Sequence, residues 1–132
     1  MNKIELAGAI ILDKQNKILL IHRNTKDLKQ WELPGGKIEP GELPKQAVIR
    51  ELKEELNIDV KIVKYMNFKE FEDNGVILKY HWYLCEIETG VPELVELKFN
   101  DMKYFSKKEL EINEELSSNM KVMISNINID DI

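Results

Sequence analysis

Apolar and polar residues follow one another along the first third of the chain in a pattern that predicts strands. Residues 4–12 are mostly apolar and predict a largely buried strand. A polar turn at residues 13–17 is expected to join this strand, as a hairpin, to a second strand at residues 18–23. Residues 31–33 are expected to form a short extended segment, which the strong turn signal Pro-Gly-Gly at 34–36 ends.

A helix is predicted over residues 43–56. Pro44 suits its first turn, where the missing N–H would have no helical partner in any case. The residues that follow are good helix formers, and Asn57 stands where a left-handed cap is expected. The apolar side chains that share one arc, and are therefore expected to pack on a sheet, are Val48, Ile49, Leu52 and Leu56.

The middle of the chain returns to strand patterns. Residues 58–63 and 65–72 each predict a strand, and Asp73-Asn74-Gly75 is a hairpin signal. From residue 76 onward the side chains are expected to alternate between two faces of a sheet. The residues predicted on one face are Val76, Leu78, Tyr80, Trp82 and Leu84, and those on the other are Ile77, Lys79, His81, Tyr83 and Cys85.

The end of the chain predicts one more strand and two helices. Residues 102–105 form the strand, and Ser106 with Glu109 fits the capping box of a short helix. A final helix is expected over residues 118–127. Strands, a helix, more strands and further helices together predict an α+β fold with a mixed sheet.

Composition narrows the classes of protein that this sequence can encode. The chain has 132 residues, of which 43% are hydrophobic, so one folded domain over residues 1–132 is expected. Its formal charge is −5, and the lysines are interleaved with acids instead of forming a basic stripe. This distribution argues against long DNA or RNA as a partner. A small phosphorylated ligand is compatible with this charge distribution, provided that a positive group lies between the ligand and the acids.

Two further features of the sequence predict the cellular compartment of the protein. No apolar run approaches the roughly 18 residues of a membrane span, and the start of the chain lacks the apolar core of a signal peptide. The single cysteine, Cys85, cannot form an internal disulfide and is expected to be a small core residue. A cytoplasmic protein that does not contact membranes is therefore expected.

Three glutamates fall on one arc of the predicted helix, beside its apolar face. Glu51, Glu54 and Glu55 lie within an arc of about 100° when placed on helical geometry. One interpretation is an ordinary charged face in contact with solvent. The other is a metal site, because close carboxylates repel one another and their hard oxygens suit Mg²⁺ or Mn²⁺. The helix alone leaves both interpretations open.

The loop before the helix favours a ligand site. Gly35 and Gly36 allow the backbone to come close to a ligand, and Lys37 follows them. The start of the helix adds free N–H groups and the positive end of the helix dipole. A double glycine by itself is more often a plain turn, so its spacing from the acids matters more than its presence.

That spacing resembles the Nudix box, G-x5-E-x7-R-E-U-x-E-E-x-G-U. Gly36 is followed after five residues by Glu42, and after seven more by the segment REL-KEEL-NI at 50–58. Only Asn57, which stands in place of the last glycine, departs from the pattern. The segment WELPGGK at 31–37 and the late segment at 104–106 are similar to MutT-type Nudix enzymes. The resemblance implies the Nudix fold, a mixed β-sheet sandwiched between helices.

The resemblance also implies an activity and a metal site. Nudix proteins hydrolyse a nucleoside diphosphate linked to another moiety, with Mg²⁺ or Mn²⁺ as cofactor. Carried over by position, Glu51, Glu54 and Glu55 are metal ligands, and the Gly35 carbonyl is a possible further one. Glu54 is then the principal ligand, and Glu51 is the candidate base that accepts a proton from the attacking water. Asp101 resembles a loop acid that completes the metal site, although it is equally compatible with an ordinary loop acid.

Other positions are implied to support or bind the substrate. Arg50 is expected to orient the carboxylates through charge-assisted hydrogen bonds, while Glu42 braces the loop against the helix. Arg23 resembles an arginine that meets substrate phosphates, with a surface salt bridge as the alternative. Asn119 aligns with an asparagine that reads the edge of a purine base, with helix capping as the alternative. Gly36 and Lys37 are also expected to contact substrate.

The expected function is hydrolysis of an (oxidised) nucleoside triphosphate to a nucleoside monophosphate and pyrophosphate. An ADP-ribose or dinucleoside polyphosphate hydrolase is the enzymatic alternative, although the chain has no obvious inserted loop for a second nucleoside-like group. A catalytically silent nucleotide sensor is the alternative from another class, and the three intact acids argue against it. The expected partner is a small-molecule nucleotide, and the protein is expected to be a monomer or a homodimer.

Overall fold

The computed structural model describes residues 2–132, which form two β-sheets, three α-helices and one short 3-10 helix. The elements in chain order are β1 (Lys3–Ile11), β2 (Ile18–Asn24), β3 (Lys29–Glu32), β4 (Gly35–Lys37), α1 (Pro44–Leu56), β5 (Asp59–Asp73), β6 (Val76–Thr89), β7 (Phe99–Phe105), α2 (Lys107–Ile112), α3 (Ser118–Asn126) and η1 (Ile129–Asp131). Within these residues no helix has the length and apolar character of a membrane span.

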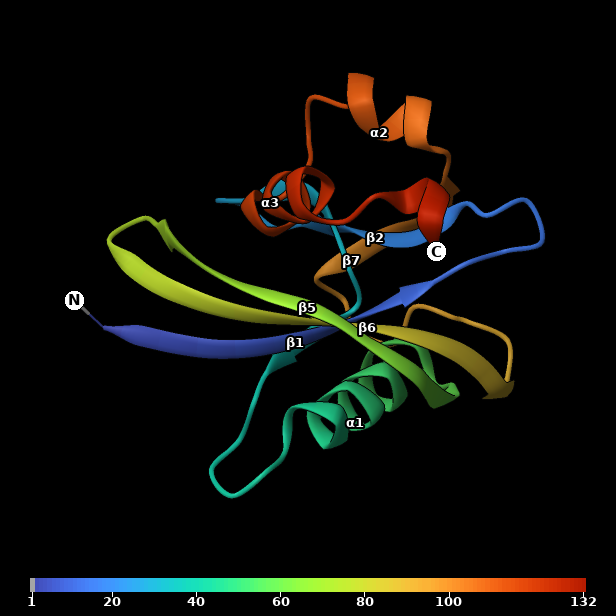
Figure 1. Cartoon of the computed structure of the whole chain (residues 1–132), viewed down its shortest axis with the longest axis horizontal. Helices are drawn as coiled ribbons and strands as arrows, with labels where there is room; N and C mark the ends of the chain where they lie inside the picture. Colours follow the sequence, from blue (N-terminus) through green and yellow to red (C-terminus); the bar gives the residue numbers. More distant parts are fainter. Residues whose placement is uncertain (1) are drawn as a thin grey trace.

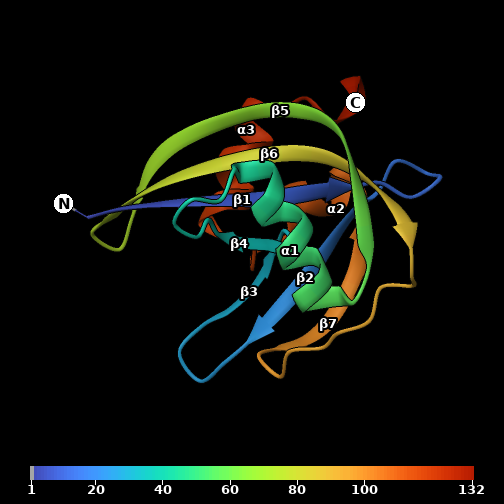
Figure 2. The ribbon, with the colours of Figure 1, turned by 90° about the horizontal axis from the view of Figure 1, so that it is seen from below.

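The larger sheet is mixed and lies between helices. Its strand order is β4-β1-β6-β5, with β1 parallel to β6 and the other neighbours antiparallel. Helix α1 covers one face and α3 lies over the opposite face (Figure 1). Seen from below, α1 crosses in front of β1 and β6 (Figure 2). The smaller antiparallel sheet has the order β3-β2-β7. This arrangement confirms the predicted α+β class with a mixed sheet between helices.

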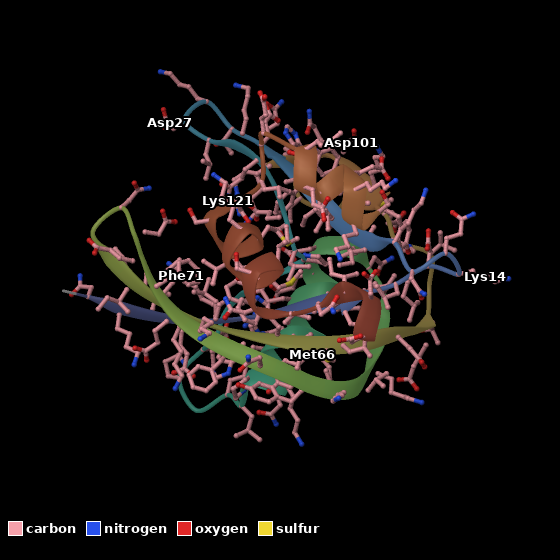
Figure 3. The ribbon with its side chains drawn as sticks, turned by 45° about the horizontal axis from the view of Figure 1, so that its top comes forward. Lys14, Asp27, Met66, Phe71, Asp101 and Lys121 are labelled. Atoms are coloured by element: carbon pink, nitrogen blue, oxygen red, sulfur yellow. The ribbon has the colours of Figure 1, made fainter. Side chains whose placement is uncertain are left out.

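Two apolar cores, one on each side of the larger sheet, hold these layers together. The core under α1 contains Val48, Leu52 and Leu56 of the helix, together with Tyr83 and Cys85 of β6. The core under α3 contains Met120 and Met123 of α3, packed against Tyr80 and Trp82 of β6. Met66 and Phe71 of β5, labelled in Figure 3, pack against this second core.

The predicted alternation along β6 is confirmed. Trp82 is fully buried on the α3 side, and Cys85, 2% exposed, is buried on the α1 side. Both faces of this strand are therefore covered by protein, which places β6 in the middle of the molecule.

The predicted hairpin between the first two strands is wrong. The turn itself forms, with Asn16 at φ 59° and the Asp13 carboxylate accepting the Lys17 N–H at 2.9 Å. Only the bridge between Leu12 and Ile18 joins the two segments, because the strands then diverge into different sheets. The position of β1 in the fold is therefore set by its pairing with the distant strand β6, and not by the local turn.

Two other local predictions are also corrected. The extended segment before Pro-Gly-Gly ends as predicted, since β3 stops at Glu32 and the chain bends at Pro34, but the two glycines do not form a plain turn: Gly35–Lys37 is β4, which pairs with β1. A Cβ on Gly35 would collide with the Ala7 carbonyl, so glycine permits this close approach. The strands predicted at 58–63 and 65–72 are one continuous strand, β5, interrupted only by irregularities in its register with β6.

Helix α1 begins and ends as predicted. Pro44 occupies its first turn, and the Leu43 N–H is capped by the side chain of Gln46 at 2.8 Å. Asn57 follows the last turn at φ 53° and ψ 41°, which is the left-handed cap expected there. Ile49 was predicted on the packed face, but it is 41% exposed, whereas Ala47 is fully buried.

Substitution of Asn57 tests the cap. Asn57→Ala is expected to lower the free energy of unfolding by about 1 kcal/mol relative to Asn57→Gly, because a Cβ disfavours the left-handed region. Both variants lose the hydrogen bond from Asn57 Nδ2 to Glu93, so their difference isolates the backbone effect. Urea denaturation of the two variants measures this difference in the free energy of unfolding. Equal stability of the two variants would show that the cap does not constrain this residue.

Candidate active site

One edge of α1 faces a cavity of about 490 Å³ between the two sheets and the start of α3. The charged and polar side chains in its wall come from distant parts of the chain. They are Arg23, Gln30, Glu32, Lys37, Glu51, Glu55, Asp73, Tyr80, Lys98, Ser117, Ser118 and Asn119. The wall also includes Gly35 and Gly36 of β4 and several leucines. The cavity therefore brings together the acids, the glycines and three basic side chains.

Glu55 is the most deeply buried acid in this wall. It is 2% exposed, and its Oε1 accepts the N–H of Gly35 at 2.8 Å. Burial raises the pKa of the Glu55 carboxyl well above its usual range, and the charges of Glu51 and Glu96 raise it further. One hydrogen bond does not compensate a buried carboxylate, so this side chain requires a proton or a cation.

Glu51 and Glu54 lie progressively further from the core. The side chain of Glu51 is 15% exposed and that of Glu54 is 54% exposed. Burial raises the pKa of Glu51, and the neighbouring charges of Glu54 and Glu96 add to this effect. The three helix acids thus share one edge of α1 beside its apolar face, as their helical spacing predicted, and along this edge they run from core to solvent.

Arg50 holds this cluster together. Its guanidinium contacts both oxygens of Glu42 at 2.8 and 2.9 Å and donates to the Lys37 carbonyl at 3.0 Å. The same group donates to Glu51 at 3.0 Å and to Glu54 at 3.3 Å. Hydrogen bonds from Arg50 lower the pKa of Glu42 to about 2. Arg50 therefore links the loop before α1 to two of the helix acids.

Gly36 allows Glu51 to reach β4. A Cβ on Gly36 would lie only 2.6 Å from the Glu51 carboxyl carbon, closer than real Cβ contacts come. Any side chain at this position would therefore displace the Glu51 carboxylate. The fixed spacing between the glycine and the helix acids has this direct steric cause.

The acids do not stand in a ready metal-binding arrangement. Within residues 2–132, no three His, Cys, Asp or Glu side chains are disposed to hold a metal ion. The Arg50 guanidinium donates hydrogen bonds to oxygens of Glu51 and Glu54, and the Gly35 N–H donates to one oxygen of Glu55. The donor chemistry nevertheless fits a hard divalent cation, because all three groups are carboxylates and one of them is buried without a compensating charge.

Arg23 lies in the cavity wall and is also paired. Its guanidinium contacts both oxygens of Glu32, at 2.8 and 3.0 Å, and lies 5.0 Å from the centre of the Phe99 ring. The salt bridge and the cavity position, posed as alternatives from sequence, therefore coexist. Lys37 and Lys98 add two more positive groups to the wall.

Asn119 is 8% exposed and lines the cavity from the first turn of α3. It does not cap that helix, because Ser117 does so by accepting the Met120 N–H at 3.2 Å. Asn119 instead accepts a hydrogen bond from the indole of Trp82 at 2.9 Å. The capping alternative is thus wrong, and the position is compatible with ligand contact.

Asp101 is not in the cavity wall. It is an exposed residue of β7, paired opposite His22, and its carboxylate accepts the Met102 N–H at 2.8 Å. Figure 3 shows Asp101 on the side of the molecule that carries α2. Glu96 is the loop acid close enough to raise the pKa of Glu51 and Glu55, after the larger effect of burial. Sequence reasoning missed Glu96 because residues 90–98 have no periodic pattern.

Comparison with known protein families agrees with this geometry. The NUDIX domain family matches residues 4–126. The chain therefore belongs to the Nudix family. It is a Nudix hydrolase, similar to named diphosphatases of the MutT type.

The similar Nudix proteins differ in substrate. CTP pyrophosphohydrolase of Escherichia coli is 39% identical over 87 residues, which cover 64% of each chain. 8-oxo-dGTP diphosphatase of Proteus vulgaris is 45% identical over 82 residues, covering 59% of this chain and 73% of the relative. The match with the first relative thus spans less than two thirds of its length. The two relatives are thus named for nucleotides with different bases.

A solved Nudix structure shows the same fold over nearly the whole chain. The MutT Nudix hydrolase of Burkholderia pseudomallei superposes with a TM-score of 0.82 at 26% identity, covering 97% of this chain and all of that one. The overall arrangement of sheets and helices is therefore shared with that structure.

Replacement of Glu55 tests whether its charge serves the site or the fold. Because burial raises its folded-state pKa above the ordinary 4.5, the folded protein binds this proton more tightly than the unfolded chain does. Stability of the metal-free protein is therefore lost as pH rises above that value. Glu55→Gln is expected to raise the free energy of unfolding by about 1 kcal/mol or more near pH 8, with the gain vanishing near about pH 4.

Urea denaturation in EDTA measures this gain. Glu54→Gln is the matched control. That side chain is 54% exposed, so its charge has little effect on the free energy of unfolding. A metal-free Glu55→Gln protein less stable than the wild type at about pH 8 would mean that the carboxylate supports the fold instead.

Proposed function

We propose that this Nudix hydrolase cleaves a nucleoside triphosphate to a nucleoside monophosphate and pyrophosphate, with Mg²⁺ or Mn²⁺ as cofactor. The observation that carries the proposal is the acid cluster on α1: Glu51 and Glu55 line a cavity also lined by Arg23, Lys37 and Lys98, and Glu54 lies on the same edge of the helix outside the cavity wall. Acids alone would repel a polyphosphate. Acids with a bound cation, flanked by basic side chains, can bind one.

The residues that would hold the cation are Glu51, Glu54 and Glu55, with the Gly35 carbonyl as a further ligand. Glu54 is the principal ligand in this proposal. Because Arg50 contacts Glu51 and Glu54, its contacts must loosen as the cation enters, while its pairing with Glu42 keeps it beside the site. Glu96 is a better candidate than Asp101 for the additional loop acid, because its charge already acts on Glu51 and Glu55.

The bound cation would neutralise phosphate charge and make a coordinated water more acidic. Arg23, Lys37 and Lys98 contribute positive charge to the same cavity wall that Glu51 and Glu55 line. Glu51 accepts a proton from the attacking water, and the water oxygen forms a bond to phosphorus as the bridging P–O bond breaks. One water is consumed, and the nucleoside monophosphate and pyrophosphate leave. Asn119 lies where it can contact the base.

The size of the cavity favours a single nucleotide. A volume of about 490 Å³ lies within the usual range of about 300–1,000 Å³ for a site that takes one small ligand. ADP-ribose and dinucleoside polyphosphates carry a second bulky group that would extend beyond it. Product analysis separates these alternatives, because only a nucleoside triphosphate releases pyrophosphate.

Glu54→Gln tests the proposal. The change removes one carboxylate from the cation site and is expected to lower kcat by at least about 100-fold for nucleoside triphosphates. The fold is expected to be unaffected, because the side chain is 54% exposed. Pyrophosphate release at saturating Mg²⁺ measures the rate. Glu111→Gln, an exposed acid on α2, is the control and should match the wild type. A Glu54→Gln enzyme with near wild-type turnover would rule out this assignment.

A further inference from the structure

Tyr80 brings an unpaired hydroxyl group to the wall of the cavity. The residue is 6% exposed, and its ring stacks on that of Trp82 with 6.2 Å between the ring centres. Among residues 2–132, the Tyr80 hydroxyl makes no hydrogen bond, although every fully buried side-chain nitrogen or oxygen has a partner. The hydroxyl is therefore not completely enclosed by protein. Because Tyr80 lines the cavity, its accessible side faces the cavity.

Gly8 leaves the space that the Tyr80 phenol occupies. A Cβ on Gly8 would overlap the Tyr80 hydroxyl oxygen and would lie only 2.9 Å from its Cε1. Any other residue at position 8 would therefore displace the phenol. Gly8 also pairs with Gly35 of β4, whose N–H donates to Glu55. The hydroxyl thus lies over β1, close to the edge of the sheet at which the α1 acids are gathered.

The surroundings of this hydroxyl keep it protonated. Burial raises the pKa of the Tyr80 hydroxyl well above its usual range, and the negative charges of Glu32, Glu55 and Glu51 raise this pKa further. A protonated phenol donates a hydrogen bond well, and it carries no charge that would repel a nucleotide. Tyr80 therefore offers the cavity a neutral donor.

The side chains beside Tyr80 in the cavity wall are apolar. Leu6 of β1 is its register partner, and Leu78 precedes it by two residues on β6, so all three side chains point to the same face of the sheet. All three also line the cavity, and we call them the cavity floor. An apolar surface with one placed polar group is typical of a site that orients the less polar part of a ligand. In a nucleotide this part is the nucleoside, since the phosphates are charged.

We propose that Tyr80 is a substrate-binding residue whose hydroxyl donates a hydrogen bond to a neutral acceptor atom of the nucleoside half of the substrate, on the base or on the sugar. The inference rests on the proposed function, in that the cavity is taken to hold a nucleotide with its phosphates beside the α1 acids. Because the hydroxyl has no partner within the protein, its loss is expected to weaken ligand binding without weakening the fold.

Tyr80→Phe tests this separation, because it removes one oxygen atom and keeps the ring. Calorimetric titration with dAMP, dGMP, dCMP and dTMP first identifies the mononucleotide that the wild type binds most tightly. The Kd of Tyr80→Phe for that ligand is expected to be at least about threefold higher. The KM for the matching triphosphate is expected to rise by a similar factor with little change in kcat, and the urea midpoint is expected not to fall. An unchanged Kd and KM would overturn the proposal.

Tyr83→Phe is the matched control. Tyr83 lies on the same strand, is 8% exposed and belongs to the core under α1, but it forms no part of the cavity wall. The same loss of one hydroxyl is therefore expected to leave the Kd for the mononucleotide unchanged. An equal loss of affinity in Tyr80→Phe and Tyr83→Phe would mean that the change acts through packing of the sheet, and would overturn the proposal.

Simpler ligands locate the acceptor atom. Pyrophosphate with Mg²⁺ has no nucleoside, so Tyr80→Phe is expected to bind it as the wild type does; a threefold loss here would assign the hydroxyl to phosphate and overturn the proposal. Deoxyribose 5-phosphate then separates the two supporting cases. A weaker affinity of Tyr80→Phe for this ligand places the acceptor on the sugar, and an unchanged affinity places it on the base.

Gly8→Ala tests the space that the phenol needs. The added methyl group displaces the Tyr80 hydroxyl, so the Kd for the mononucleotide is expected to rise at least as much as in Tyr80→Phe. In a Tyr80→Leu background, where no phenol extends over position 8, the same change is expected to leave the Kd unaltered. A Gly8→Ala protein with wild-type affinity would contradict the role given to the position of the hydroxyl.

Failure of the proposed function can be told apart from failure of this inference. If no nucleoside triphosphate is hydrolysed, the proposed function fails, but the titrations with mononucleotides still decide the role of Tyr80. If triphosphates are hydrolysed and Tyr80→Phe has the Kd and KM of the wild type, only this inference fails. A wild-type protein that neither binds a mononucleotide nor hydrolyses a triphosphate would overturn both.

Discussion

Glu55 carries a carboxylate into the protein at the edge of α1, where a single N–H from Gly35 is its hydrogen-bonding partner. A buried negative charge with so little compensation is unfavourable for folding. Glu51, whose side chain is 15% exposed, lies one helical turn earlier and adds to the repulsion. A protein selected only for stability would replace such residues with apolar ones, so their presence indicates that something else depends on the charge.

The surrounding fold keeps these acids in place without neutralising them. Arg50 contacts Glu51 and Glu54, yet its closest pairing, with both oxygens of Glu42, ties it to the loop before the helix. Gly36 leaves room for the Glu51 carboxylate beside β4. The core under α1 fixes the helix against the sheet, and the core under α3 fixes the opposite wall of the cavity. The carboxylates, the space that they need and the two packed cores that hold their surroundings in place thus occur together at the edge of α1.

The sequence predicted the parts of this arrangement that depend on local spacing. Helix α1, its left-handed cap at Asn57 and the position of the three acids on one arc beside the apolar face all follow from helical periodicity and capping chemistry. The hairpin of the first two strands was wrong and the strand at Gly35–Lys37 was missed, because contacts between distant strands override local turn signals. The same reason explains the missed residues. Glu96 lies in a loop without periodicity, and the Trp82–Asn119 bond joins residues 37 positions apart.

The central claim is that a divalent cation relieves the crowded charge on α1. Anomalous diffraction from crystals grown with Mn²⁺ tests it most directly. The account predicts a manganese peak at coordination distance, about 2.1–2.3 Å, from oxygens of at least two of Glu51, Glu54 and Glu55, with Arg50 withdrawn from them. Saturating Mn²⁺ with no peak beside α1, and with Arg50 still bonded to Glu51 and Glu54, would contradict it.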